Sequence, residues 1–253
     1  LESYGRAAAL GRPHPAAVVQ HVRLLVARGR FQESKILLER IPVAMRQRLL
    51  GQLYAEILFN TESVEPAMQS AQQVIDQDPE NALKQLWYGQ MMARVAQSTL
   101  VSEEMRKDAD AKAGAAIARS VELEPKIQEG WLALISYHLM HQNREQAEEA
   151  LRQAQLALSS ERLPIVLAKC YEMMGRWFDA ENLYRAAHES APDNMGTVRQ
   201  LATFYPGTAN PFSNQEKIAK ATPLLNKILK AAADGDVPEN DSNLVRARQP
   251  TTK

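Results

Sequence analysis

The residues that could carry chemistry are few and widely spaced. His138 and His141 lie three positions apart on one predicted helix, within reach of a shared metal ion. A metal site of the familiar kind needs a third and a fourth ligand, and no Cys, Asp or Glu lies nearby on the same helical face. We therefore interpret both imidazoles as packed or solvated side chains.

Other catalytic patterns are also missing from the sequence. Cys170 is the single cysteine, so it forms no internal disulfide, and its helical spacing predicts a small buried thiol. The 11 glycines are scattered singly and form no phosphate-binding loop, and no serine lies in a nucleophile elbow. The acidic pairs Glu103–Glu104 and Glu148–Glu149 fall on polar helix faces. The sequence predicts no enzyme, no metal and no cofactor.

The composition is that of a folded soluble protein, with 45% hydrophobic and 24% charged residues. Thirty basic residues balance thirty acidic residues, which disfavours nucleic-acid binding because phosphate contacts need a basic excess. No apolar run approaches the ~20 residues that span a bilayer. No signal peptide is visible, which slightly favours the cytoplasm, but the chain begins at Leu1 and targeting segments can lie outside it.

A small residue recurs at a nearly fixed interval along the chain. The steps between occurrences are 33, 46, 34 and 33 residues, and the long step is a 34-residue period plus an insertion of 12. A period of this size is typical of stacked supersecondary units and not of one closed core. The recurring positions are Ser34, Ala67, Ala113, Ala147 and Ala180.

Each period predicts two helices joined by a tight turn, because its apolar residues follow the helical spacing. Gly29, Asn143 and Gly175 lie between the paired helices, and Gly and Asn tolerate the left-handed conformation that ends a helix. Proline stops one helix and suits the first turn of the next. The prolines between periods are Pro79, Pro125 and Pro192.

Small residues also recur on the first helix of each pair, where a larger side chain would hold the two helices apart. The methionine pairs Met91–Met92 and Met173–Met174 are predicted to fill gaps in the core. The small residues of the first helices are Ala55, Gly89, Ala168 and Ala202.

These landmarks resemble the tetratricopeptide repeat (TPR). Residues 164–192 match its consensus best, 48–79 and 128–154 match at several positions, and 15–42 match more weakly. The resemblance implies an all-α fold, a right-handed α-solenoid of stacked antiparallel helix pairs. The best-matching stretch contains Leu167, Ala168, Tyr171, Gly175, Ala180, Tyr184, Ala187 and Pro192.

The array is interrupted within and at both ends. We predict about six TPR-like helix pairs over residues 14–233, with insertions at 97–108 and 205–213. Residues 1–13 resemble a second helix whose partner is missing, and 234–253 resemble a polar linker and the start of a further helix. The chain is therefore expected to be a segment of a longer protein.

The two insertions carry their own predictions. Residues 97–108 either lengthen the helices on both sides or form a protruding loop. They either belong to the binding face or are a tolerated surface extension. At the end of 205–213, Ser213 and Glu216 have the spacing of a capping box, so a helix should begin there. Pro223 is expected to kink that helix or to split it just before the proline.

In TPR proteins the first helices line a concave surface along which a partner peptide lies. Here the corresponding positions mix polar side chains with apolar ones such as Phe59, Leu86 and Leu132, as a peptide-binding surface would. An ordinary mixed helix surface is the alternative. The polar candidates are Arg23, Gln52, Glu56, Gln90, Ser136, Lys169, Glu172 and Arg199.

One TPR subtype holds the carboxyl-terminal tails of chaperones with a Lys and an Asn on one first helix and further Asn, Lys and Arg residues on the next two. No unit of this sequence has the Lys and Asn pair. Lys169 and Arg199 stand at lining positions without the neighbours that would complete a carboxylate clamp. The chaperone-adaptor interpretation is therefore disfavoured.

The resemblance leaves several hypotheses. The first is a non-catalytic protein–protein interaction scaffold of a bacterial protein, which binds a protein or peptide and has no nucleic acid or membrane contact within this segment. The second is a structural spacer or self-association segment, which would form a homo-oligomer. The third and weakest is a regulatory domain of an enzyme whose catalytic part lies outside this chain.

Overall fold

The regular secondary structure of the chain is α-helical. Throughout the stretches that the structure describes there is no strand, which confirms the all-α fold class. In those stretches, no helix has both the length and the apolar character needed to cross a membrane. The chain divides into two compact units, Leu1–Pro125 and Lys126–Lys253. The computed structural model describes residues 15–61, 63–158, 163–207 and 210–233.

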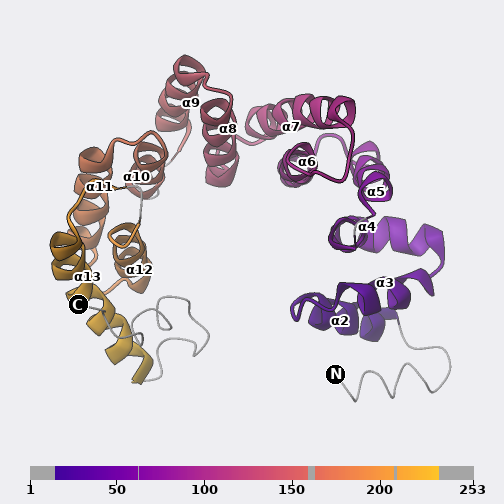
Figure 1. Cartoon of the computed structure of the whole chain (residues 1–253), viewed down its shortest axis with the longest axis horizontal. Helices are drawn as coiled ribbons and strands as arrows, with labels where there is room; N and C mark the ends of the chain where they lie inside the picture. Colours follow the sequence, from indigo (N-terminus) through magenta and orange to yellow (C-terminus); the bar gives the residue numbers. More distant parts are fainter. Residues whose placement is uncertain (1–14, 62, 159–162, 208–209, 234–253) are drawn as a thin grey trace. The chain divides into compact units, whose positions relative to one another are not determined.

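The first unit consists of consecutive helix pairs, α2 with α3, α4 with α5, and α6 with α7 (Figure 1). Successive pairs also touch, because α3 packs against α4 and α5 packs against α6. Each amphipathic helix thus buries its apolar side against a neighbour. The helices are α2 (Pro15–Val26), α3 (Phe31–Glu39), α4 (Val43–Asn60), α5 (Val64–Asp76), α6 (Ala82–Ala96) and α7 (Glu103–Leu123).

The second unit repeats this arrangement, with α8 against α9, α10 against α11, and α12 against α13. Here α10 also packs against α8 and α9, and α11 packs against α12. The helices are α8 (Gln128–Met140), α9 (Arg144–Ala157), α10 (Leu163–Met173), α11 (Trp177–Ser190), α12 (Met195–Phe204) and α13 (Asn214–Ala233).

The recurring small residues lie inside the helix pairs, as the sequence predicts. All five members of the second-helix series have a side-chain exposure of 0%. Ala55, Gly89, Ala168 and Ala202 on the first helices are buried as well. Burial of a small side chain on both helices allows the backbones of a pair to approach closely.

Gly89 shows how close this approach is. A Cβ atom on Gly89 of α6 would lie 2.6 Å from Cγ1 of Ile117 and 3.1 Å from the carbonyl oxygen of Ala113, both on α7. It would also lie 3.0 Å from the backbone nitrogen of Ile117. The backbone of α7 leaves no room for even a methyl group at this position.

The turns within the pairs use a left-handed residue at an equivalent place. Gly29 and Gly175 have φ angles of 70° and 73°. In the turn between α8 and α9, however, the left-handed residue is Gln142, with a φ of 59°, and not Asn143 as predicted. Asn143 has a φ of −85° and precedes α9 as its N-cap residue. The repeat period explains the difference, since Gln142 lies 33 residues before Gly175.

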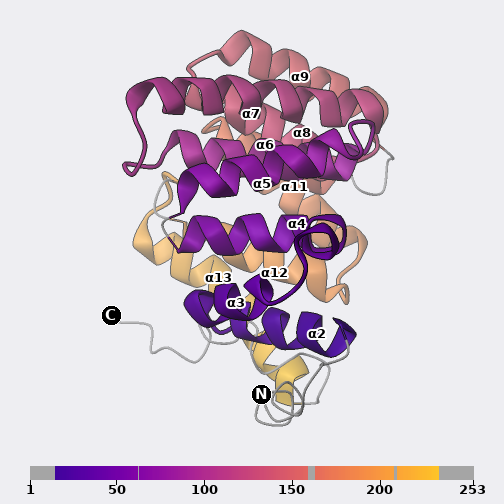
Figure 2. The same ribbon diagram turned by 90° about the vertical axis from the view of Figure 1, so that its right-hand side faces the viewer.

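The insertion at 97–108 lengthens one helix and not both. Helix α6 ends at Ala96, and α7 begins at Glu103 and runs for 21 residues. The hydroxyl of Ser102 accepts a hydrogen bond of 3.2 Å from the backbone nitrogen of Met105, which caps the first turn of α7. Residues 97–102 of the insertion therefore connect the two helices, and residues 103–108 form the start of α7. Figure 2 shows α7 running alongside α6 and α5.

The predicted capping box before α13 is confirmed. The backbone nitrogen of Ser213 donates to Glu216 Oε2 at 2.9 Å, and the backbone nitrogen of Glu216 donates to Ser213 Oγ at 3.3 Å. Of the two alternatives predicted for Pro223, a kink or a split, the split is wrong, because α13 is continuous through the proline. Leu224 and Ile228 are buried in the core, and this packing offsets the hydrogen bond that the proline removes.

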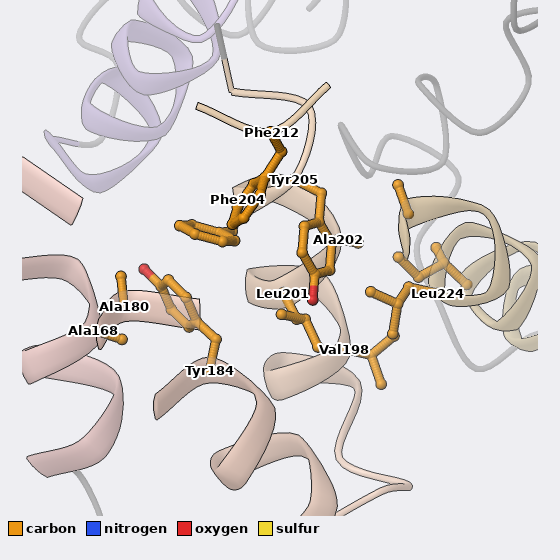
Figure 3. Close-up of a cluster of buried hydrophobic side chains, with 12 residues drawn as sticks. Ala168, Ala180, Tyr184, Val198, Leu201, Ala202, Phe204, Tyr205, Phe212 and Leu224 are labelled. Atoms are coloured by element: carbon orange, nitrogen blue, oxygen red, sulfur yellow. The ribbon is translucent and has the colours of Figure 1, made fainter. Parts of the chain in front are cut away.

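Aromatic side chains anchor the 205–213 segment to the core of the second unit (Figure 3). The Phe204 ring lies 5.2 Å from the Tyr184 ring and 6.1 Å from the Phe212 ring, measured between centroids. The side-chain nitrogen of Asn210 donates to the carbonyl oxygens of Phe204 and Tyr205 at 3.0 and 2.9 Å. These bonds help to satisfy the carbonyl groups at the end of α12, where the Phe204 oxygen also accepts a bond of 3.2 Å from the backbone nitrogen of Gly207.

A buried carboxylate joins three elements at the same place. Glu181 of α11 is 7% exposed. Its Oε1 atom accepts a hydrogen bond of 3.0 Å from the Tyr205 hydroxyl and pairs with Lys220 Nζ of α13 at 2.8 Å. Burial raises the pKa of Tyr205, so its hydroxyl stays protonated and donates to Glu181. The 205–213 segment is thus held by specific polar contacts as well as by its aromatic rings.

The predictions for the two ends, a second helix in residues 1–13 and a linker with a further helix in 234–253, lie outside the described residues.

We expect Gly89→Ala to destabilise the chain by about 1–3 kcal/mol through overpacking against α7. On an exposed helical surface the same change would raise stability by about 1 kcal/mol. The sign of the change in the free energy of unfolding therefore tests whether α6 and α7 approach closely at Gly89. Urea unfolding followed by circular dichroism measures it. The control is Gln90→Ala at the next, exposed position, which should change stability by less than about 0.5 kcal/mol.

Gln142→Gly should stabilise the second unit by about 0.5–1 kcal/mol, because glycine adopts the left-handed conformation without steric cost. The matched change Gly175→Gln should be destabilising, since it introduces the same strain at a φ of 73°. Thermal unfolding of both variants checks the pair. Equal melting temperatures for all three chains would contradict the assignment of strain to Gln142.

Candidate functional site

The cysteine and histidine side chains first considered for catalysis are buried or packed against neighbouring residues. Cys170 is fully buried, and this burial raises the pKa of its thiol to about 12, so it is not a reactive thiolate. The Nδ1 atom of His141 lies 2.8 Å from the carbonyl oxygen of Tyr137, and the two rings are 4.3 Å apart. Within the described part of the chain, no group of three His, Cys, Asp or Glu residues could hold a metal ion.

The first-helix face of the first unit, meaning the surface of α2, α4 and α6, carries an ion pair between two of its helices. Glu56 of α4 forms an ion pair of 2.6 Å with Arg94 of α6. The Arg94 guanidinium also lies over the Phe59 ring, 4.4 Å from its centroid. The sequence analysis missed Arg94, which lies one helical turn after Gln90. Because Gln90 occupies the same repeat position as Glu56, a search one turn along the next first helix would have found this partner.

The remaining candidates of this unit are scattered. Arg23, Gln52 and Gln90 are exposed on α2, α4 and α6. Leu86, predicted to face a partner, is 6% exposed and belongs to the core, so this prediction is wrong. No described contact joins the three exposed residues into one site.

The second unit has a pocket on its first-helix face, the surface of α8, α10 and α12. Its volume is about 620 Å³, within the range of ligand-binding pockets. The two predicted residues Lys169 and Glu172 lie together in it, one turn apart on α10. The pocket is lined by Leu132, Lys169, Glu172, Met173, Gly175 and Trp177.

One lining residue was misread from the sequence, and another was missed. Met173 was predicted to fill the core, but its side chain is 40% exposed and lines the pocket. Met91 and Met92 are 1% exposed, which confirms the prediction for that pair. Trp177 was not singled out in the sequence. Gly175, with its positive φ, forms the turn after which the chain resumes as α11 with Trp177.

The carboxyl group of Glu172 is held in a partly buried place. It accepts a hydrogen bond of 3.0 Å from the hydroxyl of Tyr184. Desolvation raises the pKa of Glu172 above its ordinary value, and the hydrogen bond from Tyr184 and the charge of Lys169 oppose this rise. The pocket thus combines an apolar wall, an ammonium group and a carboxyl group that protonates more readily than a solvated one.

Two predicted residues lie on the same face but not in this pocket. Ser136 is half-buried on α8, and Arg199 is half-buried on α12. Neither belongs to the lining. The structure therefore brings together Lys169 and Glu172 and leaves the other polar candidates apart.

Glu172→Gln should change how the stability of the second unit depends on pH. Because the folded pKa is raised above the unfolded value of 4.5, the native state binds more protons between these two values. The free energy of unfolding therefore contains a contribution that grows as the pH falls through this window and is lost as it rises. Glutamine removes that contribution, which unfolding at a series of pH values measures. Glu149→Gln is a control of opposite sign, since hydrogen bonds from Arg152 and Gln153 lower the pKa of Glu149 to about 2.

Comparison with known proteins gives matches by structure but none by sequence. No protein-family model matches the chain, and no curated protein matches its sequence. Solved structures do resemble it. A thermophilic TPR protein of Thermus thermophilus is 20% identical, with a TM-score of 0.50 over 75% of this chain and 98% of its own. A tetratricopeptide repeat protein of Parabacteroides merdae is 13% identical, with a TM-score of 0.50 over 93% of each chain. The chain has the fold of the tetratricopeptide-repeat proteins.

Proposed function

We propose that the chain is a non-catalytic protein-interaction scaffold, and that the first-helix face of the second unit binds a peptide segment of its partner. The observation that carries this proposal is the pocket formed by α8, α10 and the start of α11. The fold supports it, because paired helices present the side chains of their first helices on a common surface. The thiol of Cys170 is buried, so this side chain is not available as a nucleophile.

The chemistry of the pocket suits one apolar side chain flanked by polar groups. Leu132, Met173 and Trp177 supply apolar area, and tryptophan is enriched among the residues that dominate binding energy. Lys169 offers three hydrogen-bond donors, and Glu172 offers an acceptor or, when protonated, a donor. An extended peptide that inserts an apolar side chain can therefore also pair its backbone with these groups.

Selection of a random peptide library on the chain tests this proposal. We expect selected peptides to share an apolar residue, and Trp177→Ala and Lys169→Glu each to weaken their binding by about tenfold, as the loss of a contact worth about 1.4 kcal/mol would. Fluorescence anisotropy with a labelled peptide measures the dissociation constant. The proposal is wrong if these variants bind with unchanged affinity, or if the library yields no sequence-specific binder.

Two controls have matched positions in the first unit. Phe31 follows the turn glycine Gly29 as Trp177 follows Gly175, so Phe31→Ala should leave peptide binding unchanged. Lys107→Glu makes the same charge change as Lys169→Glu on an exposed residue of α7. Size-exclusion chromatography with light scattering tests the self-association alternative, since a monomer at high concentration would count against it.

A further inference from the structure

A second groove lies in the first unit, between α5 and α7. Its volume is about 300 Å³, at the lower end of the range for ligand pockets. Helices α5 and α7 each pack against α6, which lies between them in sequence and contributes Tyr88 and Met92 to the lining. Most of its lining residues belong to the second helices α5 and α7, and none of them is among the candidates of the first-helix face.

Three methionine side chains from three different helices line the groove, Met68 of α5, Met92 of α6 and Met105 of α7. Methionine is flexible and polarizable, so it adapts to apolar side chains of different shapes. Met105 lies in the first turn of α7, within the 97–108 insertion. The insertion therefore builds one wall of the groove, and it is more than a surface extension.

Polar groups lie among the lining residues of the groove as well. The Tyr88 hydroxyl donates a hydrogen bond of 2.6 Å to Gln72 Oε1, which joins α6 to α5 at one end. Met68 and Met92 each lie one helical turn away from this bond, Met68 on α5 and Met92 on α6. Glu65 lines the groove from the first turn of α5. Along α5 the lining therefore passes from the polar Gln72 through the apolar Met68 to the carboxylate of Glu65.

The charges around the groove favour a cationic occupant. Glu65 lines it, and burial together with the carboxylates of Asp108 and Asp76 raises the pKa of Tyr88 to about 12. The ammonium group of Lys112 also lines it but is paired with Asp108 at 2.7 Å. Three carboxylates therefore act around the groove, and one of them is neutralised by Lys112.

We propose that the groove between α5 and α7 binds a basic amphipathic helix of a partner protein. Its apolar side chains lie against Met68 and Met105, with the buried Met92 beneath them, and its Lys or Arg side chains approach Glu65 and Asp76. Such a helix would pack against α5, α6 and α7 by the helix-in-groove mode of recognition. This inference concerns a different surface from the proposed peptide pocket and does not depend on it.

Binding of two synthetic helices tests the proposal. One is a fluorescein-labelled amphipathic helix of Leu and Lys, and the other has Glu in place of every Lys. We expect saturable anisotropy changes with the basic helix, weakened by added salt because the attraction is screened, and none with the acidic helix. Equal binding of both helices would overturn the proposal.

Variants locate the site. Glu65→Lys and Met105→Gln should each weaken binding of the basic helix by about tenfold, through loss of the charge attraction and of apolar contact respectively. The matched controls are Glu145→Lys, which lies in the first turn of α9 as Glu65 does in α5, and Met140→Gln, an exposed methionine of α8. Both controls should bind as the unaltered chain does.

The outcomes separate the two surfaces. Binding of the basic helix should be unchanged in Lys169→Glu, which alters only the peptide pocket. Unaltered affinity in Glu65→Lys would overturn the assignment, and because Glu65 is exposed this variant stays informative even if circular dichroism shows that Met105→Gln loses helix.

Discussion

Where α6 packs against α7, the backbone nitrogen of Ile117 comes within 3.0 Å of the place a Cβ atom on Gly89 would occupy. A buried small residue on the second helix recurs in other helix pairs, at Ser34, Ala67, Ala147 and Ala180. Close packing brings large side chains of neighbouring helices into contact around these points. The positions of the surface residues then follow, because a helix whose buried side is fixed has only one side left to present.

The two insertions depart from this regular packing, and each makes contacts of its own. The 97–108 insertion lengthens α7 and places Met105 beside Met68 and Met92. The 205–213 insertion is held down by Phe212 and by the pairing of Tyr205 and Lys220 with Glu181. The 97–108 insertion thus lines a groove, whereas Tyr205 and Phe212 of the 205–213 insertion are buried in the core. The difference lies in aromatic and polar side chains that can reach buried partners in the second case.

Charge also acts locally in this chain, although the net charge is zero. Glu56 and Arg94 neutralise one another on the first-helix face of the first unit, and Lys112 neutralises Asp108 beside the groove. Lys169 and Glu172 differ, because they lie one turn apart in a pocket and Glu172 is engaged by the hydroxyl of Tyr184. Partly buried groups of this kind interact more strongly than exposed pairs, since solvent screens them less.

The sequence by itself determined the helix pairs, the small residues between them and the capping box at Ser213, because these depend on local spacing and on which residues tolerate a given backbone. The resemblance to TPR proteins also placed Lys169 and Glu172 at lining positions of one first helix. Only the tertiary structure decided that Leu86 is buried, that Met173 is exposed and that Gln142 is the left-handed residue. The reason is physical: periodicity gives the face of a helix on which a side chain lies, but burial depends on which neighbouring helix covers that face. The groove beside Met105 depends in the same way on three helices at once.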